Sequence, residues 1–152
     1  MTLPNRPSAV DWRGWVLADP LALLGRVLLS AFFLDEGYDQ IVGYGDTISY
    51  MESFGVSGRL LPLVILVEIG GGLAVLVGFL ARPAAIALAG LCLLTAIFFH
   101  RDFADIDQFI HFQKNLTMAG GFLTLAAWGA GAWSLDALIA ARRRPRPRGD
   151  SG

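Results

Sequence analysis

The stretch from Leu60 to Ala85 reads LLPLVILVEIGGGLAVLVGFLARPAA, and it decides the fold class of the chain. About twenty consecutive apolar or small residues, Leu60 to Leu80, are enough for one helix to cross a hydrocarbon layer about 30 Å thick. The run contains one charged residue, Glu68, before it ends at Arg82. A carboxylate inside a bilayer costs on the order of a few kcal/mol, so it must face a partner, water or a ligand. We therefore expect any chemistry of this protein within reach of Glu68.

The composition indicates an integral membrane protein. The 152 residues are 55% hydrophobic and 16% charged, whereas about a quarter of the residues in a soluble domain are charged. The apolar residues also fall in long runs instead of alternating, which predicts helices. The only cysteine, Cys92, excludes an intrachain disulfide and is expected to be a buried, inert thiol.

The fold predicted from these runs is an all-α, four-helix transmembrane bundle. Its four spans are expected at Val16–Leu34, Leu60–Leu80, Pro83–Phe99 and Lys114–Ala132. Arg82-Pro83 makes a tight connection, so the second and third spans should be antiparallel neighbours. A short helix, Thr47–Phe54, is too short to span and is expected at the membrane surface between the first two spans.

Local signals set the expected helix ends. Asp19-Pro20 fits the start of the first helix, with Asp19 as N-cap, and the acidic cluster Asp35–Asp39 is expected to end that helix. Asp46 is expected to cap the short surface helix. A polar loop is expected from His100 to Gln113.

The chain is expected to divide into a flexible cytoplasmic N-terminus (1–13), the bundle (14–136) and a basic cytoplasmic tail (137–152). The arginines support this orientation, because Arg6, Arg13, Arg82 and the five tail arginines fall on one side of a four-span bundle. By the positive-inside rule both termini are cytoplasmic. The tail is short and has no aromatic platform, so it favours a topology signal or anionic lipid, and nucleic-acid binding is not expected.

Arg26 and Glu68 are the charges expected deepest in the membrane. Each lies roughly mid-depth in its predicted helix, and pairing would offset the cost of burying both. A structural Arg26–Glu68 ion pair between the first two spans is the favoured interpretation. The alternatives are a polar site where this pair binds a head group such as a quinone carbonyl, and a proton relay.

A polar cluster is expected at the outer membrane edge. His100 and His111 flank the predicted loop, and Lys114 and Asn115 begin the fourth helix. Hydrogen-bonded interfacial histidines are the favoured interpretation; an outer-edge pocket that a quinone ring enters from the lipid is the alternative. Haem or metal ligation is disfavoured, because eleven residues across a loop is not a recognised ligand spacing, and no metal site is expected. No Ser-His-Asp or Cys-His set is visible, so no catalytic residue is assigned.

Three stretches together resemble the DoxX family of small inner-membrane proteins, over about Leu21 to Asp136. They are Leu24-Gly25-Arg26 with Phe32, Phe33 and Gly37; Glu68-Ile-Gly-Gly-Gly through Gly78 to Arg82-Pro-Ala-Ala; and Phe99-His100 with His111-Phe-Gln-Lys114-Asn115 through Gly120-Gly121, Gly129-Ala-Gly131 and Ser134-Leu-Asp136. One departure is Gln40, which stands where the family often has a lysine three residues after Gly37.

The resemblance implies a multi-pass protein of the bacterial inner membrane in a redox setting. The favoured function is an accessory subunit of a respiratory or quinone-linked oxidoreductase complex, anchoring or stabilising partner subunits, more often non-catalytic than an enzyme. Expected partners are lipid, those subunits and further copies of this chain in a homo-oligomer; quinone is the one cofactor considered. The alternatives are a quinone-reactive subunit with its site at Arg26, Glu68 and the His100/His111 edge, and a small proton-coupled transporter using Glu68.

Overall fold

A computed structural model describes residues 17–143 of the chain. The predicted N-terminal segment (1–13) and the part of the basic tail beyond Arg143 lie outside the described residues. Between residues 17 and 143 the regular structure is helical throughout, as predicted. The elements are α1 Ala18–Val42, α2 Tyr44–Ser53, the 3₁₀ turn η2 Gly58–Leu60, α3 Leu61–Ile65, the π-helical segment η3 Leu66–Gly70, α4 Gly71–Val77, α5 Ala81–Phe99, α6 Ile106–Trp128 and α7 Leu135–Arg143.

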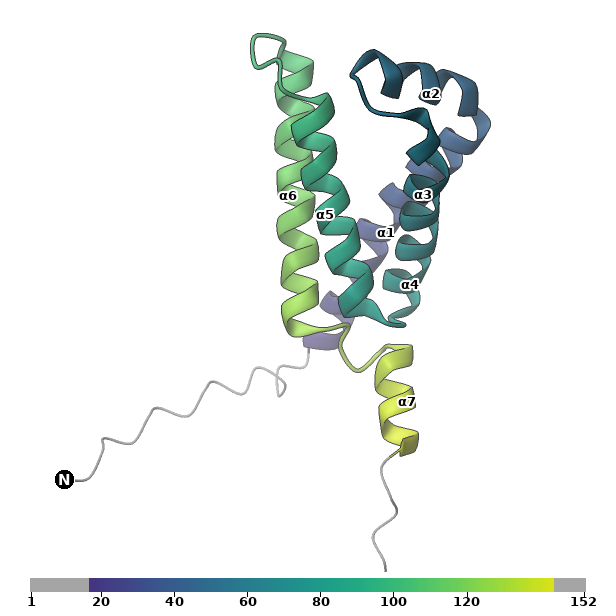
Figure 1. Ribbon diagram of the computed structural model, residues 1–152. Coiled ribbons are helices and arrows are strands. Elements are labelled where there is room, and N and C mark those ends of the chain that lie inside the picture. The colour runs from purple at the N-terminus through teal and green to yellow at the C-terminus, as the bar shows by residue number, and fades with distance from the viewer. Residues whose placement is uncertain (1–16, 144–152) are drawn as a thin grey trace, which may run out of the picture.

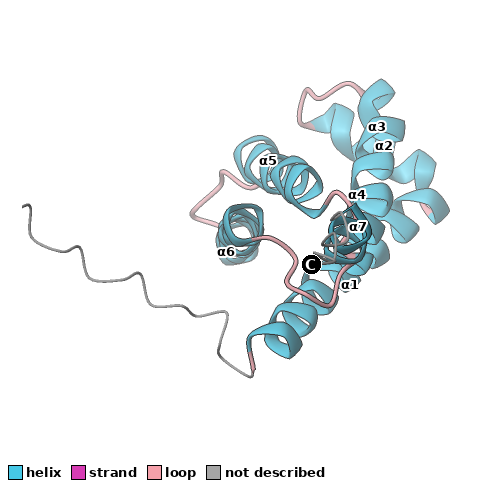
Figure 2. Ribbon diagram, turned by 90° about the horizontal axis from the view of Figure 1, so that it is seen from below, coloured by secondary structure: helices cyan, strands magenta, loops and turns pink. Residues whose placement is uncertain are grey.

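The long helices pack in an antiparallel series. The elements η2 to α4 form one continuous helical segment, Gly58–Val77, which packs along α1 and then against α5. The predicted neighbours on either side of Arg82 are therefore confirmed. The most extensive contact is between α5 and α6, which stand side by side in Figures 1 and 2. The surface helix α2 lies across one end of the bundle and α7 projects from the other (Figure 1), and we call these the α2 end and the α7 end.

The first helix is longer than predicted. The prediction that Asp35–Asp39 ends it was wrong, because α1 continues through this cluster to Val42 and ends at Gly43. The cluster contains no strong helix breaker, and Gly37 within it is buried against η3, so packing holds these turns in the helix. Asp19 is not the N-cap; Leu17 occupies that position, and the Asp19 carboxylate accepts a hydrogen bond from the Ala132 N–H at 2.8 Å.

Other helix ends also differ from the predictions. Helix α2 begins directly after Gly43 and has no side-chain cap, so Asp46 lies inside its first turn. Helix α6 begins eight residues before Lys114, because the Asp105 side chain accepts from the Asp107 N–H and starts the helix there. His111 is consequently on a helix and not in the predicted loop.

The tight turn between α4 and α5 is stabilised from the α7 end. Gly78 and Leu80 both have left-handed backbone conformations, with φ of 69° and 47°. The Asp136 carboxylate, in the first turn of α7, accepts hydrogen bonds from the N–H groups of Leu80 and Ala81 at 2.9 and 3.0 Å. Helix α7 was not predicted, and this contact ties it to the turn.

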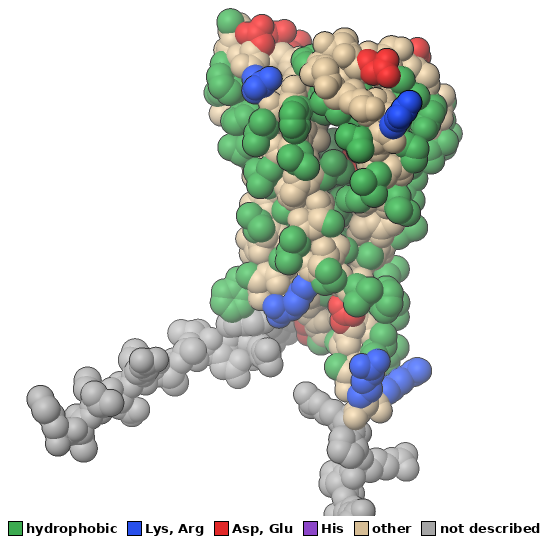
Figure 3. All heavy atoms as spheres, viewed as in Figure 1, with side chains coloured by type: hydrophobic (Ala, Val, Ile, Leu, Met, Phe, Trp, Pro, Cys, Tyr) green, Lys and Arg blue, Asp and Glu red, His purple; other side chains and the backbone are tan. Residues whose placement is uncertain are grey.

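The distribution of side chains is that of a membrane protein. Gly58–Val77 and Ala81–Phe99 are long and apolar enough to cross a bilayer. Helices α1 and α6 are also long enough, but α1 carries more charges and α6 more polar residues in its first turns. On the face drawn in Figure 3, hydrophobic side chains cover the middle of the molecule and charges gather towards its two ends. Large apolar side chains are exposed on every long helix, while four polar ones are buried within residues 17–143: Arg26, Ser30, Glu68 and Asn115. Such an inside-out pattern fits a surface that faces lipid.

Candidate functional site

A cavity of about 670 Å³ opens at the α2 end of the bundle. Side chains from α1, α2, α3, η3, α5 and α6 line it, so residues far apart in the sequence meet there. Its walls are mainly apolar and aromatic, with Phe32, Phe33, Tyr50, Phe98 and Phe99 among them. A cavity of this size and lining, with a few polar groups, is typical of a small-molecule site.

Two polar side chains of the cavity, Glu68 and Gln40, each contain a buried oxygen atom, and we call them the floor. Glu68 is 5% exposed and belongs to the π-helical segment η3. The Gln40 side chain hydrogen-bonds its carboxyl group. Even so, the Oε2 atom of Glu68 and the Oε1 atom of Gln40 are both buried without a hydrogen-bond partner. Because π-helical turns occur frequently at functional sites, the location of Glu68 in one is a second indication of function.

Gly37 explains how α1 comes close enough to bring Gln40 to Glu68. A Cβ atom at Gly37 would lie 2.7 Å from the Cγ1 atom of Ile69 and 3.4 Å from the Cβ atom of Glu68. Small residues at such a point let two helix backbones approach within a membrane. One helical turn later, Gln40 therefore reaches the same level as the carboxyl group.

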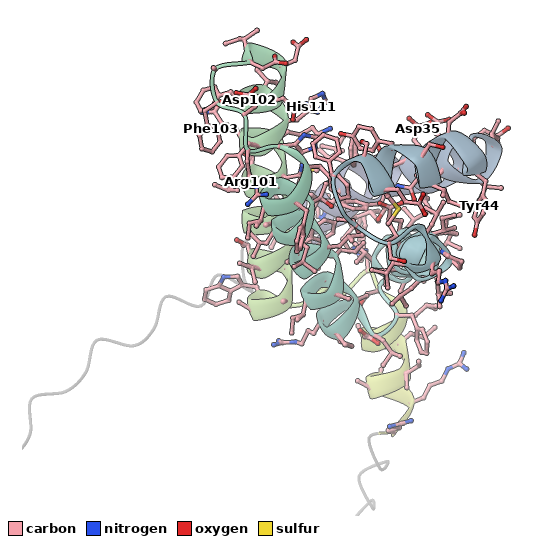
Figure 4. The ribbon with its side chains drawn as sticks, turned by 45° about the horizontal axis from the view of Figure 1, so that its top comes forward. Asp35, Tyr44, Arg101, Asp102, Phe103 and His111 are labelled. Atoms are coloured by element: carbon pink, nitrogen blue, oxygen red, sulfur yellow. The ribbon has the colours of Figure 1, made fainter. Side chains whose placement is uncertain are left out.

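The mouth of the cavity carries His100, His111 and Lys114, which we call the rim. The rings of His100 and His111 stack, with centroids 5.0 Å apart and an angle of 21° between their planes. His100 Nδ1 also shares a hydrogen bond of 2.9 Å with Gln108 Oε1. In Figure 4, His111 lies on the face of α6 that is turned towards α1 and α2. Arg101 lies on the opposite side of the pair formed by α5 and α6.

Electrostatics at the rim favour a neutral imidazole. Burial lowers the pKa of His111 below its ordinary value, and the Lys114 ammonium and the His100 ring act in the same direction. On the opposite wall, burial raises the pKa of Tyr50, and the Glu36 carboxylate adds to this effect. The rim and the opposite wall therefore offer a neutral imidazole, that of His111, and a neutral phenol, that of Tyr50, beside one ammonium ion.

Lys114 and Asn115 bring α6 into the site. The Lys114 ammonium lies 4.7 Å from the centre of the Phe32 ring, a cation–π contact between α6 and α1. Asn115 is 5% exposed, and its Nδ2 atom donates to the His111 carbonyl at 3.0 Å. The four residues of the predicted polar cluster thus line one cavity together with Glu68.

Arg26 lies apart from this cavity. Arg26 is 1% exposed, and its guanidinium donates to the carbonyls of Leu76, at 3.2 Å, and of Trp133. A third carbonyl, that of Val75, lies 3.5 Å away. The predicted Arg26–Glu68 ion pair was wrong, because Arg26 is bound to backbone carbonyls at the α7 end.

The antiparallel register of α1 and η3–α4 gives the physical reason. Gly37 lies opposite Glu68, whereas Arg26 lies beside Gly78. Eleven positions of α1 separate Gly37 from Arg26, which is about 16 Å along a helix. The prediction that Arg26 and Glu68 both lie near the middle of the membrane was wrong, because α1 extends beyond its predicted end at Leu34.

Two observations concern the arrangement of potential metal and haem ligands. Between residues 17 and 143, no group of three or more His, Cys, Asp or Glu side chains is arranged to hold a metal ion. The stacked rings of His100 and His111 lie face to face on one side of the cavity, and two axial haem ligands would have to approach an iron from opposite sides.

The sequence prediction missed Gln40, Glu36 and Tyr50. A signal for two of them was present, since Phe33, Glu36 and Gln40 recur at helical spacing and so share a face of α1. The sequence analysis did not predict that this face continues to Glu36 and Gln40, because it expected the first helix to end at Leu34. For Tyr50 the pattern gave no signal, since only the packing of α2 across the bundle places it in the cavity wall.

Comparison with known proteins agrees with the resemblance. The family model described as DoxX matches residues 21–101. The chain is 50% identical, over 81% of its length and 95% of the relative, to "Inner membrane protein YqjF" of Escherichia coli (strain K12). It is 33% identical, over 76% of its length and 88% of the relative, to "Inner membrane protein YphA" of the same organism. No solved structure matches. The chain therefore belongs to the DoxX family of membrane proteins, as its sequence motifs predicted.

Proposed function

We propose that this chain is an accessory membrane subunit of a quinone-linked oxidoreductase complex, and that the cavity at the α2 end holds the quinone head group. The observation that carries the proposal is the juxtaposition within one cavity of aromatic walls, a buried carboxyl group with a free oxygen at the floor, and polar groups at the rim. A flat ring with an oxygen at each end needs this combination of apolar walls and polar ends.

The residues present fit such a head group. Phe32, Phe33 and Phe99 offer apolar surface to the faces of a ring. Lys114 and the His100/His111 pair can donate hydrogen bonds to one ring oxygen, and the floor can meet the other. Bound there, a quinone would supply two-electron redox chemistry to partner subunits, while this chain orients the head group and excludes water.

The membrane arrangement that accompanies the proposal has four spans: α1, the segment Gly58–Val77, α5 and the part of α6 that begins at Lys114, which leaves His111 outside the span at the membrane edge. Arg82, Arg142 and Arg143 lie at the α7 end, so the positive-inside rule places that end, and both termini, in the cytoplasm. The cavity then opens towards the outer face. Reporter fusions at both termini should report the cytoplasm, and opposite locations would contradict the four-span arrangement.

Photolabelling tests the binding proposal. The purified chain in lipid nanodiscs is irradiated with a photoreactive short-chain quinone, and the labelled peptides are identified by mass spectrometry. We expect labels on α1, α5 and α6 residues that line the cavity, and a reduction of about tenfold in Glu68→Gln. Glu52→Gln, a matched change on α2 that does not line the cavity, should label normally. Labels scattered over the lipid-facing surface would overturn the proposal.

The accessory role has its own test. A mild-detergent pull-down of the tagged chain from its membranes, followed by mass spectrometry, should recover subunits that carry redox cofactors. Recovery of the chain without such subunits would contradict the accessory role while leaving the cavity proposal open to the photolabelling result.

A proton-coupled transporter is the competing hypothesis, and the buried Glu68 at the floor of a one-sided cavity favours it. Alternating access requires such a site to open to the other face as well. Solute uptake into liposomes that depends on a pH gradient and on Glu68 would support the transporter over the subunit.

A further inference from the structure

A second, smaller groove of about 320 Å³ lies beside the cavity, where the loop after α5 meets the start of α6. Its charged side chains are those of Arg101, Asp102 and Asp105, and none of them lines the larger cavity. The proposed quinone site therefore leaves this groove without a role.

The groove lies at the level of phospholipid head groups. Helix α5 is long and apolar enough to span a bilayer and ends at Phe99, so Arg101 stands two positions beyond the spanning segment. The wall of the groove continues along α5 as apolar surface. Phe98 lines the groove and is 45% exposed, and Leu94, one turn earlier on the same face of α5, is 54% exposed. A molecule with its head group in the groove can therefore lay an acyl chain along this helix.

The charges of the groove are available to a ligand. Within residues 17–143, the Arg101 side chain forms no hydrogen bond or ion pair, although Asp102 is its neighbour in the sequence. The carboxylates of Asp102 and Asp105 each use the Oδ1 atom to accept from a backbone N–H, at 3.1 and 2.9 Å. Their Oδ2 atoms remain available. One guanidinium and two carboxylates thus share a groove without neutralising one another.

We infer that this groove binds the head group of a phospholipid that carries both a phosphate and a primary ammonium group. The planar fork of Arg101 suits a phosphate, and the two carboxylates can accept hydrogen bonds from the ammonium group. Figure 4 shows Asp102 near the tip of the α5–α6 pair and Arg101 closer to its middle. The lipid has the same order, because its phosphate lies nearer to the acyl chains than its ammonium group does.

The two carboxylates decide between the possible head groups. A lipid with a phosphate and no amine would bring an uncompensated negative charge beside Asp102 and Asp105, which repel it. A choline head group is positively charged but has no N–H to donate. A primary amine offers both the charge and the donors, so ethanolamine is the head group that the groove fits. This inference does not depend on the proposed quinone site.

Native mass spectrometry of the purified full chain in detergent micelles tests the inference. The chain is titrated with phosphatidylethanolamine, phosphatidylcholine and phosphatidylglycerol that have identical acyl chains, and the fraction of chain with bound lipid gives each affinity. We expect phosphatidylethanolamine to bind about tenfold more tightly than either of the other two lipids.

Variants of the groove separate the two halves of the head group. Arg101→Gln should weaken the binding of phosphatidylethanolamine about tenfold, because the phosphate loses its partner. Asp102→Asn/Asp105→Asn should abolish the preference for phosphatidylethanolamine over phosphatidylglycerol, while Asn at position 105 can still cap α6. Arg59→Gln and Asp35→Asn are matched controls, since both residues are exposed and lie outside the groove, and they should leave the affinities unchanged.

Several results would overturn the inference. Equal binding of the three lipids would do so, as would tighter binding of phosphatidylcholine or phosphatidylglycerol, or groove variants that bind like the controls. If Arg101→Gln loses partner subunits in the pull-down but binds lipid normally, the groove belongs to a partner protein and the inference is wrong. None of these results changes the outcome of the photolabelling experiment, so the two proposals fail separately.

Discussion

Gln40 of α1 hydrogen-bonds the carboxyl group of Glu68 in η3, and each side chain keeps one buried oxygen without a donor. This contact, and not an Arg26–Glu68 ion pair, is the polar link between the first two long helical segments near the cavity. Gln40 also stands at the position where the sequence motif leads one to expect a lysine. The carboxyl group of Glu68 is thereby left available to a ligand.

The first prediction concerns the separation of Arg26 from Glu68. Arg26→Met should destabilise the chain by about 3 kcal/mol, because carbonyl groups at the α7 end lose their donor. In the double variant with Glu68→Gln, the two changes should add within about 0.5 kcal/mol, since the sites are independent. Thermal or denaturant unfolding in detergent of the unaltered chain, the two single variants and the double variant measures this double-mutant cycle. A coupling above about 1 kcal/mol would restore the ion pair as the better interpretation.

Replacing Gln40 by lysine should create a salt bridge with Glu68. In Gln40→Lys the ammonium group can donate to the free oxygen of Glu68, so the free energy of unfolding should rise by about 1 kcal/mol. The same substitution at Gln113, which is exposed on α6, should have little effect. Ligand binding at the floor should weaken in Gln40→Lys alone, and a loss of stability there would contradict the contact.

Close packing at Gly37 gives a third prediction. Gly37→Ala should cost about 1–3 kcal/mol, because its Cβ atom would lie 2.7 Å from Ile69 Cγ1. Trimming the partner in Gly37→Ala/Ile69→Ala should recover part of the loss at that contact. Gly25→Ala on the same helix has no atom within 4 Å of the new Cβ and should be neutral or slightly stabilising. Equal effects at Gly37 and Gly25 would argue against the close approach of α1 to η3.

Asp136 should stabilise the turn between α4 and α5. Asp136→Ala removes the acceptor for the Leu80 and Ala81 N–H groups, and we expect a loss of about 1 kcal/mol, as for a helix cap. Asp46→Ala is the matched control, because α2 has no side-chain cap. Hydrogen exchange at the two amides should accelerate in Asp136→Ala only. Unchanged exchange would show that α7 does not hold this turn.

The titration of His111 gives a prediction with a defined sign. Its pKa is lowered from an ordinary value of 6.5, so the unfolded chain binds more protons in this range. The contribution of His111 to stability is therefore fully present above about pH 6.5 and is lost as the pH falls through that value towards the lower, folded pKa.

Nuclear magnetic resonance of labelled histidine measures this pKa directly. We expect a midpoint below 6.5, and Lys114→Gln should raise it, because the ammonium ion is one cause of the shift. Arg101→Gln should not, since Arg101 is not among the groups that shift His111. A midpoint above 6.5 in the unaltered chain would contradict the described position of the ring.

Much of the local structure followed from the sequence alone. The uninterrupted apolar run around Glu68 required helices in lipid, Arg82-Pro83 forced an antiparallel turn, and the ordered motifs identified the family. These features depend on the identity of neighbouring residues, because chain length, hydropathy and turn chemistry act locally. The polar residues His100, His111, Lys114 and Asn115 were also named in advance, although the use of their cavity is still a proposal.

Tertiary structure alone decided which polar groups meet. The level of each residue along α1 depends on its register against η3, which the close approach at Gly37 fixes. That register carries Arg26 to the carbonyls at the α7 end and brings Gln40 to Glu68. A helix sequence specifies the face on which a side chain lies, but not the depth at which a neighbouring helix presents its partner, because depth is set by the packing of both backbones together.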